Sequence, residues 1–202
     1  MFRRLKTILP NSSKRSVKRL YRNIIDSFAY KFSKTSTSLQ CRRHIIFVCK
    51  GNVCRSPFAE HYLANLNHKN CREIKIESCG LDTDQGTVSP PDAILAAENF
   101  GINLISHRSK SIIACNLENA ELILAMEFEH YQRLKKDFPR YISKMHLLNE
   151  FAPFPDKLLC NIYDPFGLGV NEFIRCFKKM KKALDSLWTL FEANKDISAD
   201  KS

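Results

Sequence analysis

The segment from His44 to Pro57 constrains the fold of this chain more than any other part of it. His44 to Val48 is a short run of β-branched and aromatic residues, which is typical of a buried strand. A loop follows, and Pro57 is a favourable first residue for a helix that continues to Ala64. A loop that closes onto a helix N-terminus presents free backbone N–H groups and a positive dipole end, so this segment suits an anion such as phosphate.

The loop itself carries two reactive side chains, Cys49 and Arg55, with five residues between them. Cysteine is a nucleophile only as its thiolate, and a helix N-terminus and a nearby cation both favour that form. The planar guanidinium of Arg55 can bind two phosphoryl oxygens and stabilise charge on them in a transition state. Gly51 permits a tight backbone path, and Asn52 tolerates a positive φ. The loop therefore predicts a phosphate site with a thiolate at its base. Zinc ligation by Cys49 and Cys54 is disfavoured because no second ligand pair accompanies them, and no metal or cofactor is expected.

The string from Cys49 to Pro57 resembles the active-site loop of the low-molecular-weight protein tyrosine phosphatases, and the bacterial branch linked to exopolysaccharide export is the nearest. The resemblance extends over roughly residues 43 to 192. Four further segments match the family in order, namely 77–80, 101–110, 122–126 and 164–166.

The resemblance implies a role for each matched residue. Cys49 would attack phosphorus and form a phosphocysteine, with Arg55 holding the phosphoryl oxygens. Asp164 would protonate the leaving phenolate and then activate water, although from the residues alone it could merely begin a turn. The substrate-binding residues implied are Lys50, Gly51, Asn52, Val53, Cys54, Ser56 and Phe166.

A supporting network is also implied, formed by Asn52, Ser56, Ser78 and His107. Ser56 would donate to the Cys49 sulfur, but it also fits the N-cap position before Pro57. His107 is expected to be structural rather than a general base. Three substitutions and one segment depart from the family pattern and leave substrate preference open. Lys50 adds charge at the rim, Cys79 replaces alanine, Phe166 replaces tyrosine, and the segment 82–86 stands where an aromatic residue is common.

Cys54 is the redox candidate. The family carries a second cysteine at this position that can form a disulfide with the nucleophile and protect it from irreversible oxidation. The alternative is a small residue packed behind the loop. Cys71, Cys79, Cys115, Cys160 and Cys176 form no close pair in the sequence.

The charge of the chain is concentrated at its start. Residues 1–43 hold 12 Lys or Arg and one acidic residue, Asp26, so they account for the whole net charge of +11. Apolar residues at helical spacing among these cations predict a basic amphipathic helix. It is expected to bind an anionic membrane surface or an acidic partner, and nucleic acid is not expected because no motif for it is present. A cleaved transit peptide and a helix packed on the domain are the alternatives.

The domain organisation follows from the pattern of strands and helices. A basic N-terminal extension, 1–42, precedes a catalytic domain, 43–194, through a Ser/Thr-rich linker at 33–38. Strands are expected near 44–48, 73–78, 121–125 and 143–148, and helices near 57–67, 90–100, 127–138 and 171–192. The alternation predicts an α/β fold, a three-layer sandwich with a four-stranded parallel doubly wound sheet, plus the helical extension.

The predicted function is a cytoplasmic phosphatase that hydrolyses phosphotyrosine in proteins, among them a tyrosine kinase of polysaccharide export by analogy with the family. Reduced thiols agree with a cytosolic location. Two alternatives remain open, an arsenate reductase of the related fold and a non-enzymatic phosphoprotein-binding module. Removal of residues 1–40 is expected to leave the kinetics on small substrates unchanged.

Overall fold

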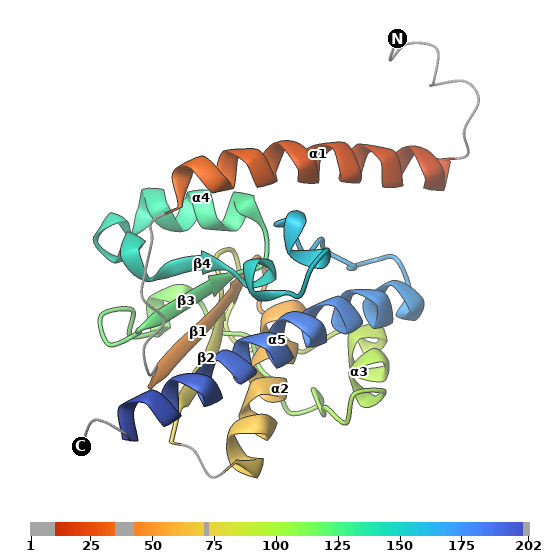
Figure 1. Cartoon of the computed structure of the whole chain (residues 1–202). Coiled ribbons are helices and arrows are strands. Elements are labelled where there is room, and N and C mark those ends of the chain that lie inside the picture. The colour runs from red at the N-terminus through yellow and green to blue at the C-terminus, as the bar shows by residue number, and fades with distance from the viewer. Residues whose placement is uncertain (1–10, 35–42, 71–72, 200–202) are drawn as a thin grey trace.

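The computed structural model describes residues 11–34, 43–70 and 73–199 (Figure 1). Its centre is a four-stranded parallel sheet in the order β2-β1-β3-β4. The strands are β1 His44–Cys49, β2 Lys75–Gly80, β3 Leu122–Ala125 and β4 Met145–Leu147. The predicted α/β fold with a doubly wound sheet is confirmed. Most of the predicted linker at 33–38, and Cys71, lie outside the described residues.

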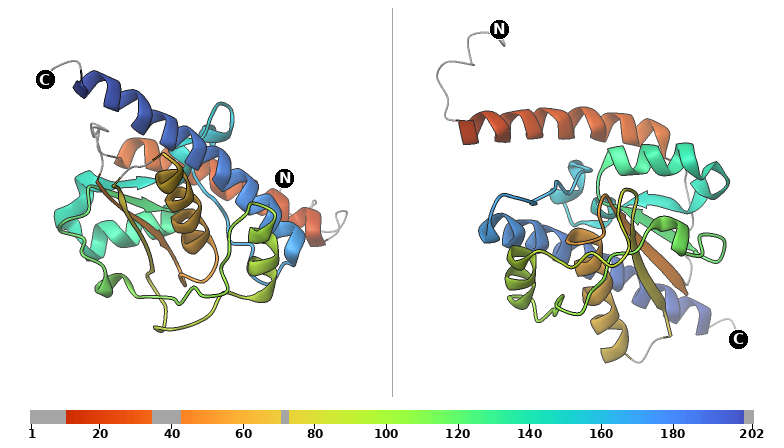
Figure 2. Two further views of the ribbon diagram at one scale, coloured as in Figure 1. Left: turned by 90° about the horizontal axis from the view of Figure 1, so that it is seen from below. Right: turned by 180° about the vertical axis from the view of Figure 1, so that it is seen from behind.

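Helices cover both faces of the sheet, which makes the three layers visible in Figures 1 and 2. One face carries α2 Arg55–Lys69, α3 Pro91–Glu98 and α5 Val170–Ala199, and the other carries α4 Phe128–Asp137. The strand β1 is buried along its whole length because it lies between these layers. Its side chains alternate, so Ile45 and Phe47 join the core beneath α2 and α5, while Ile46 and Val48 join the core beneath α4.

Two strands differ from the sequence prediction. Strand β2 runs two residues further along the chain than expected, to Gly80, where it meets the loop after β1. Strand β4 has only three residues, because the flanking segments Pro139–Lys144 and Leu148–Phe151 form 3₁₀ turns instead of extended backbone. Apolar residues in such turns resemble strand residues in the sequence, and only their packing distinguishes them.

The predicted basic helix is present as α1, Asn11–Ser33. It lies along the outside of the molecule next to α4 (Figure 1). Its C-terminal end is fixed by Tyr30, which is buried and packs edge-on against Phe128 and Tyr131. The Tyr30 hydroxyl accepts a hydrogen bond from the amide of Leu147 at 3.0 Å. Within the described residues, no helix combines the length and hydrophobicity that crossing a membrane requires.

Candidate active site

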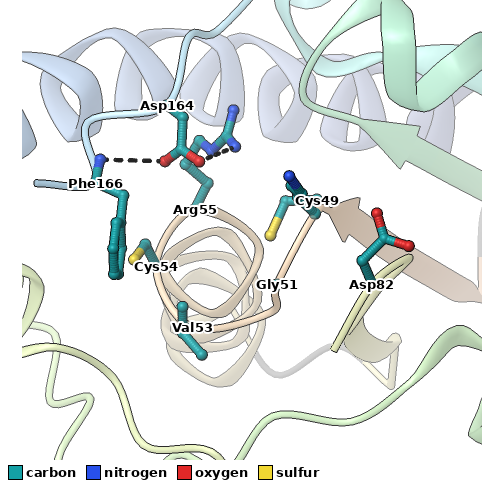
Figure 3. Close-up of a pocket in the computed structure, with 9 residues that line it drawn as sticks. Cys49, Gly51, Val53, Cys54, Arg55, Asp82, Asp164 and Phe166 are labelled. Carbon is teal, nitrogen blue, oxygen red and sulfur yellow. Dashed lines mark hydrogen bonds and ion pairs between the residues drawn. The ribbon is translucent and has the colours of Figure 1, made fainter. Parts of the chain in front are cut away.

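A cavity of about 270 Å³ opens where the carboxyl ends of the central strands meet the loop after β1 (Figure 3). The residues that line it are Cys49, Lys50, Gly51, Val53, Cys54, Arg55, Asp82, Asp164 and Phe166. All except Asp82 were predicted as site residues from the sequence. Asp164 and Phe166 come from more than a hundred positions further along the chain, so the fold brings together two segments that the loop motif alone does not connect.

The loop from Cys49 to Arg55 has a tightly constrained backbone. Asn52 has a φ of 50°, the left-handed region that asparagine tolerates better than most residues. Gly80, at the end of β2, approaches the loop so closely that a Cβ there would lie 2.8 Å from the carbonyl oxygen of Lys50. A glycine at this position is therefore required for β2 to support the loop.

The sulfur of Cys49 is almost completely buried at the base of the cavity and has two polar neighbours. Its Sγ lies 3.0 Å from the hydroxyl of Ser56 and accepts from the backbone N–H of Asn52 at 3.3 Å. The Ser56 oxygen accepts a hydrogen bond from the Asn52 side-chain amide at 3.0 Å. The single hydroxyl proton of Ser56 has two acceptors within reach, the Cys49 sulfur at 3.0 Å and the Cys79 carbonyl oxygen at 3.3 Å. Once Cys49 is a thiolate, its charge makes the sulfur the stronger acceptor, so donation from Ser56 stabilises the negative charge.

A chain of buried hydrogen bonds holds Asn52 and Ser56 in place. The amide of Asn52 also donates to Ser78 Oγ at 2.8 Å, and Ser78 donates to Glu60 Oε2 at 2.5 Å. The His107 ring donates from Nε2 to the Asn52 carbonyl at 2.8 Å. Burial lowers the pKa of His107, so the ring is neutral and serves as a donor. The four predicted support residues are thus connected directly.

The structure adds one member to this network and changes one expectation. Glu60 was missed by the sequence analysis, although it stands one helical turn after Ser56 and shares its face of α2. The N-cap interpretation of Ser56 is wrong, because α2 begins at Arg55 and Cys54 occupies the cap position. Ser56 lies inside the first turn, where its side chain points to the sulfur instead of capping the helix.

Arg55 is the most enclosed charged residue of the site, with 2% of its surface exposed. Its guanidinium donates to the Ile162 carbonyl at 2.9 Å, pairs with Glu127 at 2.5 Å and pairs with Asp164 at 3.0 Å (Figure 3). Burial opposes its charge, but Glu127 and Asp164 more than compensate and raise the Arg55 pKa above its ordinary value. Glu127 stands two residues after the end of β3. No signal in the sequence identified it as a site residue.

Asp164 is held near the cavity by its own loop. Its Oδ1 accepts from the backbone N–H of Phe166 at 3.2 Å, and its other oxygen pairs with Arg55. The carboxylate is 43% exposed, so it can reach a group that enters the cavity from solvent. The Phe166 ring is exposed and forms one wall beside it.

Two further features of the cavity concern the cysteines. Burial, together with Cys49 and Asp164, raises the pKa of the Cys54 thiol well above its usual range, so Cys54 stays protonated. Two of the other cysteines, which form no close pair in the sequence, meet in the folded structure. The thiols of Cys79 and Cys115 share a hydrogen bond that raises the pKa of Cys79 and lowers that of Cys115.

Helix α1 contacts the segment that leads into Asp164. The amide of Cys160 donates to Ser27 Oγ at 2.9 Å, and the amide of Asn161 donates to Asn23 Oδ1 at 2.9 Å. The Asn161 side chain in turn donates to Asp26 at 2.7 Å. Further along, the Arg19 guanidinium stacks over the ring of Tyr163, 4.5 Å from its centroid. Helix α1 of the N-terminal extension therefore packs against the segment that precedes Asp164. Because of these contacts, removal of residues 1–40 should alter the kinetics on small substrates, which differs from the expectation from the sequence.

We expect the double substitution Asn23→Ala and Ser27→Ala to lower kcat for p-nitrophenyl phosphate by about tenfold, because small displacements of a reacting group are costly. Two backbone N–H groups, of Cys160 and Asn161, would lose their acceptors, which also lowers Tm by at least about 4 °C. Val17→Ala, at a half-exposed position of α1, is the matched control and should change neither quantity. Unchanged kinetics in the double variant would mean that α1 does not position the acid segment.

At the rim of the cavity, Asp82 is paired with Arg133 from α4. Lys50 and Val53 complete the lining. Among the described residues, no group of three or more His, Cys, Asp or Glu side chains is placed to hold a metal ion.

Comparison with known proteins gives consistent matches to the catalytic part of the chain. The family model described as "Low molecular weight phosphotyrosine protein phosphatase" matches residues 44–200. The protein-arginine-phosphatase of Bacillus subtilis (strain 168) is 29% identical over 143 residues, which is 71% of this chain and 93% of that protein. Wzb, a low molecular weight protein-tyrosine-phosphatase of Escherichia coli (strain K12), is 32% identical over 149 residues, 74% of this chain and 88% of Wzb.

A solved structure shares the fold. It is described as the YwlE arginine phosphatase, a cysteine-to-serine mutant with a phosphorylated active-site serine. The two chains superpose with a TM-score of 0.65 at 27% identity, over 74% of this chain and 95% of the other. Because the family model spans most of the sequence and includes every residue that lines the cavity, this chain belongs to the low molecular weight phosphotyrosine protein phosphatase family.

Proposed function

We propose that this protein is a protein-tyrosine phosphatase that works through a phosphocysteine intermediate. The observation that carries the proposal is the convergence of three groups on one cavity. The Cys49 sulfur lies at its base, the buried Arg55 guanidinium lies beside it, and the Asp164 carboxylate stands at its edge. A nucleophile, an oxyanion-binding fork and a proton donor are the three groups that phosphoryl transfer needs.

In the first step, the Cys49 thiolate attacks phosphorus and the bond to the tyrosine oxygen breaks. The loop N–H groups and Arg55 bind the phosphoryl oxygens. The negative charge of these oxygens competes with the Asp164 carboxylate for the Arg55 guanidinium. Release from Arg55 removes the contact that favours the Asp164 carboxylate, so Asp164 takes up a proton from solvent and then donates it to the departing phenolate. The Ser56 hydroxyl, 3.0 Å from the sulfur, supports the thiolate before the attack.

In the second step, water hydrolyses the phosphocysteine. Asp164, now a carboxylate, takes a proton from water as the oxygen attacks phosphorus, and the thiolate of Cys49 leaves. Inorganic phosphate is the product, and Cys49 and Asp164 return to their initial states. Ser56 again stabilises the charge on sulfur, so it assists the leaving group of this step. The related mutant enzyme described with a phosphorylated active-site serine supports an intermediate on the loop nucleophile.

Two features of the cavity favour an aryl phosphate over a phosphoguanidine. The exposed Phe166 ring beside Asp164 offers an apolar wall for a phenol ring. The Asp82 carboxylate at the rim could pair with a guanidinium, but Arg133 already engages it. The relation to Wzb suggests a tyrosine kinase of polysaccharide export as the protein substrate. We also propose a cytoplasmic location, where reducing conditions keep a nucleophilic thiol active.

The test is hydrolysis by the purified, reduced full chain of p-nitrophenyl phosphate and of matched phosphotyrosine and phosphoarginine peptides. We expect turnover of p-nitrophenyl phosphate and a clear preference for the phosphotyrosine peptide. Preference for phosphoarginine would assign the activity of the Bacillus subtilis relative instead. No turnover of any of the three by the folded protein would contradict the proposal, and arsenate reduction and phosphopeptide binding would then be measured.

The same cavity predicts a protective redox role for Cys54. Peroxide oxidises the Cys49 thiolate to a neutral sulfenic acid, which removes one of the charges that raise the Cys54 pKa. Cys54 can then lose its proton and attack that sulfur as a thiolate, so that a disulfide forms and the hydroxyl group of the sulfenic acid leaves with a proton as water. We expect dithiothreitol to restore most activity after brief peroxide treatment of the native protein, and to restore little in Cys54→Ser. Cys115→Ser, which removes one thiol of the hydrogen-bonded pair Cys79 and Cys115, is the control and should recover like the native protein. Equal recovery in Cys54→Ser would assign Cys54 a packing role.

A further inference from the structure

A helix packed on a domain is expected to turn its apolar side inward, but α1 turns a mostly polar side toward the domain and leaves its apolar side exposed. The side that faces the catalytic domain makes polar contacts through Asn23, Asp26 and Ser27, with Tyr30 the one large apolar anchor. Seven large apolar residues are exposed, each by between 42% and 88% of its surface. They are Val17, Leu20, Tyr21, Ile24, Ile25, Phe28 and Phe32.

These seven residues form one continuous stripe, here called the outer stripe of α1. Residues of an α-helix turn by about 100° each, and at that spacing the seven span an arc of about 140°. Asn23, Ser27 and Tyr30 fall outside this arc, on the adjoining side of the helix that faces the domain. Figures 1 and 2 show α1 on the outside of the molecule, with the whole domain on its inner side. All seven side chains of the outer stripe are at least 42% exposed, and α1, with 23 residues, is about 35 Å long.

The cations of α1 are placed around this stripe. By the same helical spacing, Lys18 lies just outside one edge of the stripe, beside Ile25, and Lys31 lies near the other edge, beside Leu20. Both lysines are exposed. The one acidic residue of the extension, Asp26, faces inward and receives a hydrogen bond from Asn161. The outer stripe is therefore apolar along its centre and positively charged along both edges, with no carboxylate on it.

We propose that the outer stripe of α1 binds the surface of an anionic lipid bilayer, with the helix lying in the plane of the interface. An apolar face bordered by cations matches both the acyl region and the charged headgroups of such a surface. A second copy of the chain is a poorer occupant, because pairing two stripes would bring together two extensions that each carry the whole net charge of +11. The inner side of α1 would keep its contacts with the segment 160–163.

The test is co-sedimentation of the full chain with vesicles. Vesicles of phosphatidylcholine mixed with phosphatidylglycerol should bind the chain at low salt, and added salt or the use of phosphatidylcholine alone should weaken binding. Lys18→Gln should reduce binding about fivefold, and Phe28→Ser about tenfold or more, because it removes a large apolar side chain from the interface.

Two matched controls lie away from the outer stripe. Lys69→Gln removes an exposed charge at the end of α2, on the far side of the molecule from α1 in both figures, and Ile113→Ser removes an apolar side chain that is 87% exposed. Both should bind vesicles like the native chain. The proposal is overturned if the chain does not sediment with anionic vesicles, if the controls weaken binding as much as the test variants, or if the chain is a dimer that Phe28→Ser dissociates. Phosphatase activity is not part of this test, so its outcome is independent of the proposed reaction.

Discussion

Replacement of Cys49 by serine is expected to lower kcat for p-nitrophenyl phosphate by at least about 10⁴-fold, as loss of a nucleophile does in other covalent enzymes. A serine hydroxyl is protonated at neutral pH and is a weak nucleophile without a neighbouring base. The polar groups nearest the sulfur are the Ser56 hydroxyl and the Asn52 amide, neither of which is a base. Steady-state kinetics of the purified variant measure the loss.

Binding of phosphate should survive the same substitution. Arg55 and the loop N–H groups remain in place, so calorimetric titration with inorganic phosphate should give an affinity within a few-fold of the native value. Cys54→Ser is the matched control, because it makes the same chemical change five positions along the loop and should retain turnover under reducing conditions. Turnover retained in Cys49→Ser, or lost in Cys54→Ser alone, would move the nucleophile to Cys54.

Asp164→Asn should slow cleavage of phenyl phosphate by about 10²–10⁴-fold, the range typical of general acid catalysis. An amide cannot protonate the departing oxygen, although it keeps the shape of the carboxyl group. The loss should be smaller for p-nitrophenyl phosphate, because nitrophenolate leaves with less help from a proton. The measurement is kcat/KM for both substrates in both proteins.

The dependence on leaving group separates proton donation from a structural role. Asp164 also pairs with Arg55 at 3.0 Å, so loss of that contact alone would slow both substrates equally. Asp82→Asn is the matched control, since it is a second aspartate lining the same cavity, and it should not change the ratio between the two substrates. Equal losses for both substrates in Asp164→Asn would assign the general acid to another residue.

Much of this molecule could be predicted from local sequence signals. The apolar run of β1, the loop after it and the start of α2 are adjacent in the chain, so periodicity and helix-start signals locate Cys49 and Arg55 directly. The position of Asp164 was predicted from a motif match, since a lone Asp-Pro pair also fits a turn. The alternation of strands and helices was sufficient to predict the parallel sheet.

Residues that act through distant contacts could not be found in this way. Glu127 supports Arg55 from 72 positions away, and Glu60 reaches the loop through Ser78, which stands on another strand. Neither carboxylate belongs to a motif. In the local sequence, each looks the same as a glutamate on the exposed face of a helix. The contact between Cys79 and Cys115 likewise depends on how β2 packs against a 3₁₀ turn.

Helix α1 shows most clearly what the sequence determined and what the tertiary structure decided. Composition and spacing alone established a basic amphipathic helix, because charge and helical periodicity are local properties of the chain. The side of the helix that meets the domain depended on tertiary contacts. The backbone N–H groups of Cys160 and Asn161 need acceptors once they are buried, and Ser27 and Asn23 supply them. The side of α1 that satisfies those polar groups faces the domain, so the apolar stripe faces outward. Hydrophobic periodicity by itself predicts the opposite orientation, with the apolar stripe against the domain.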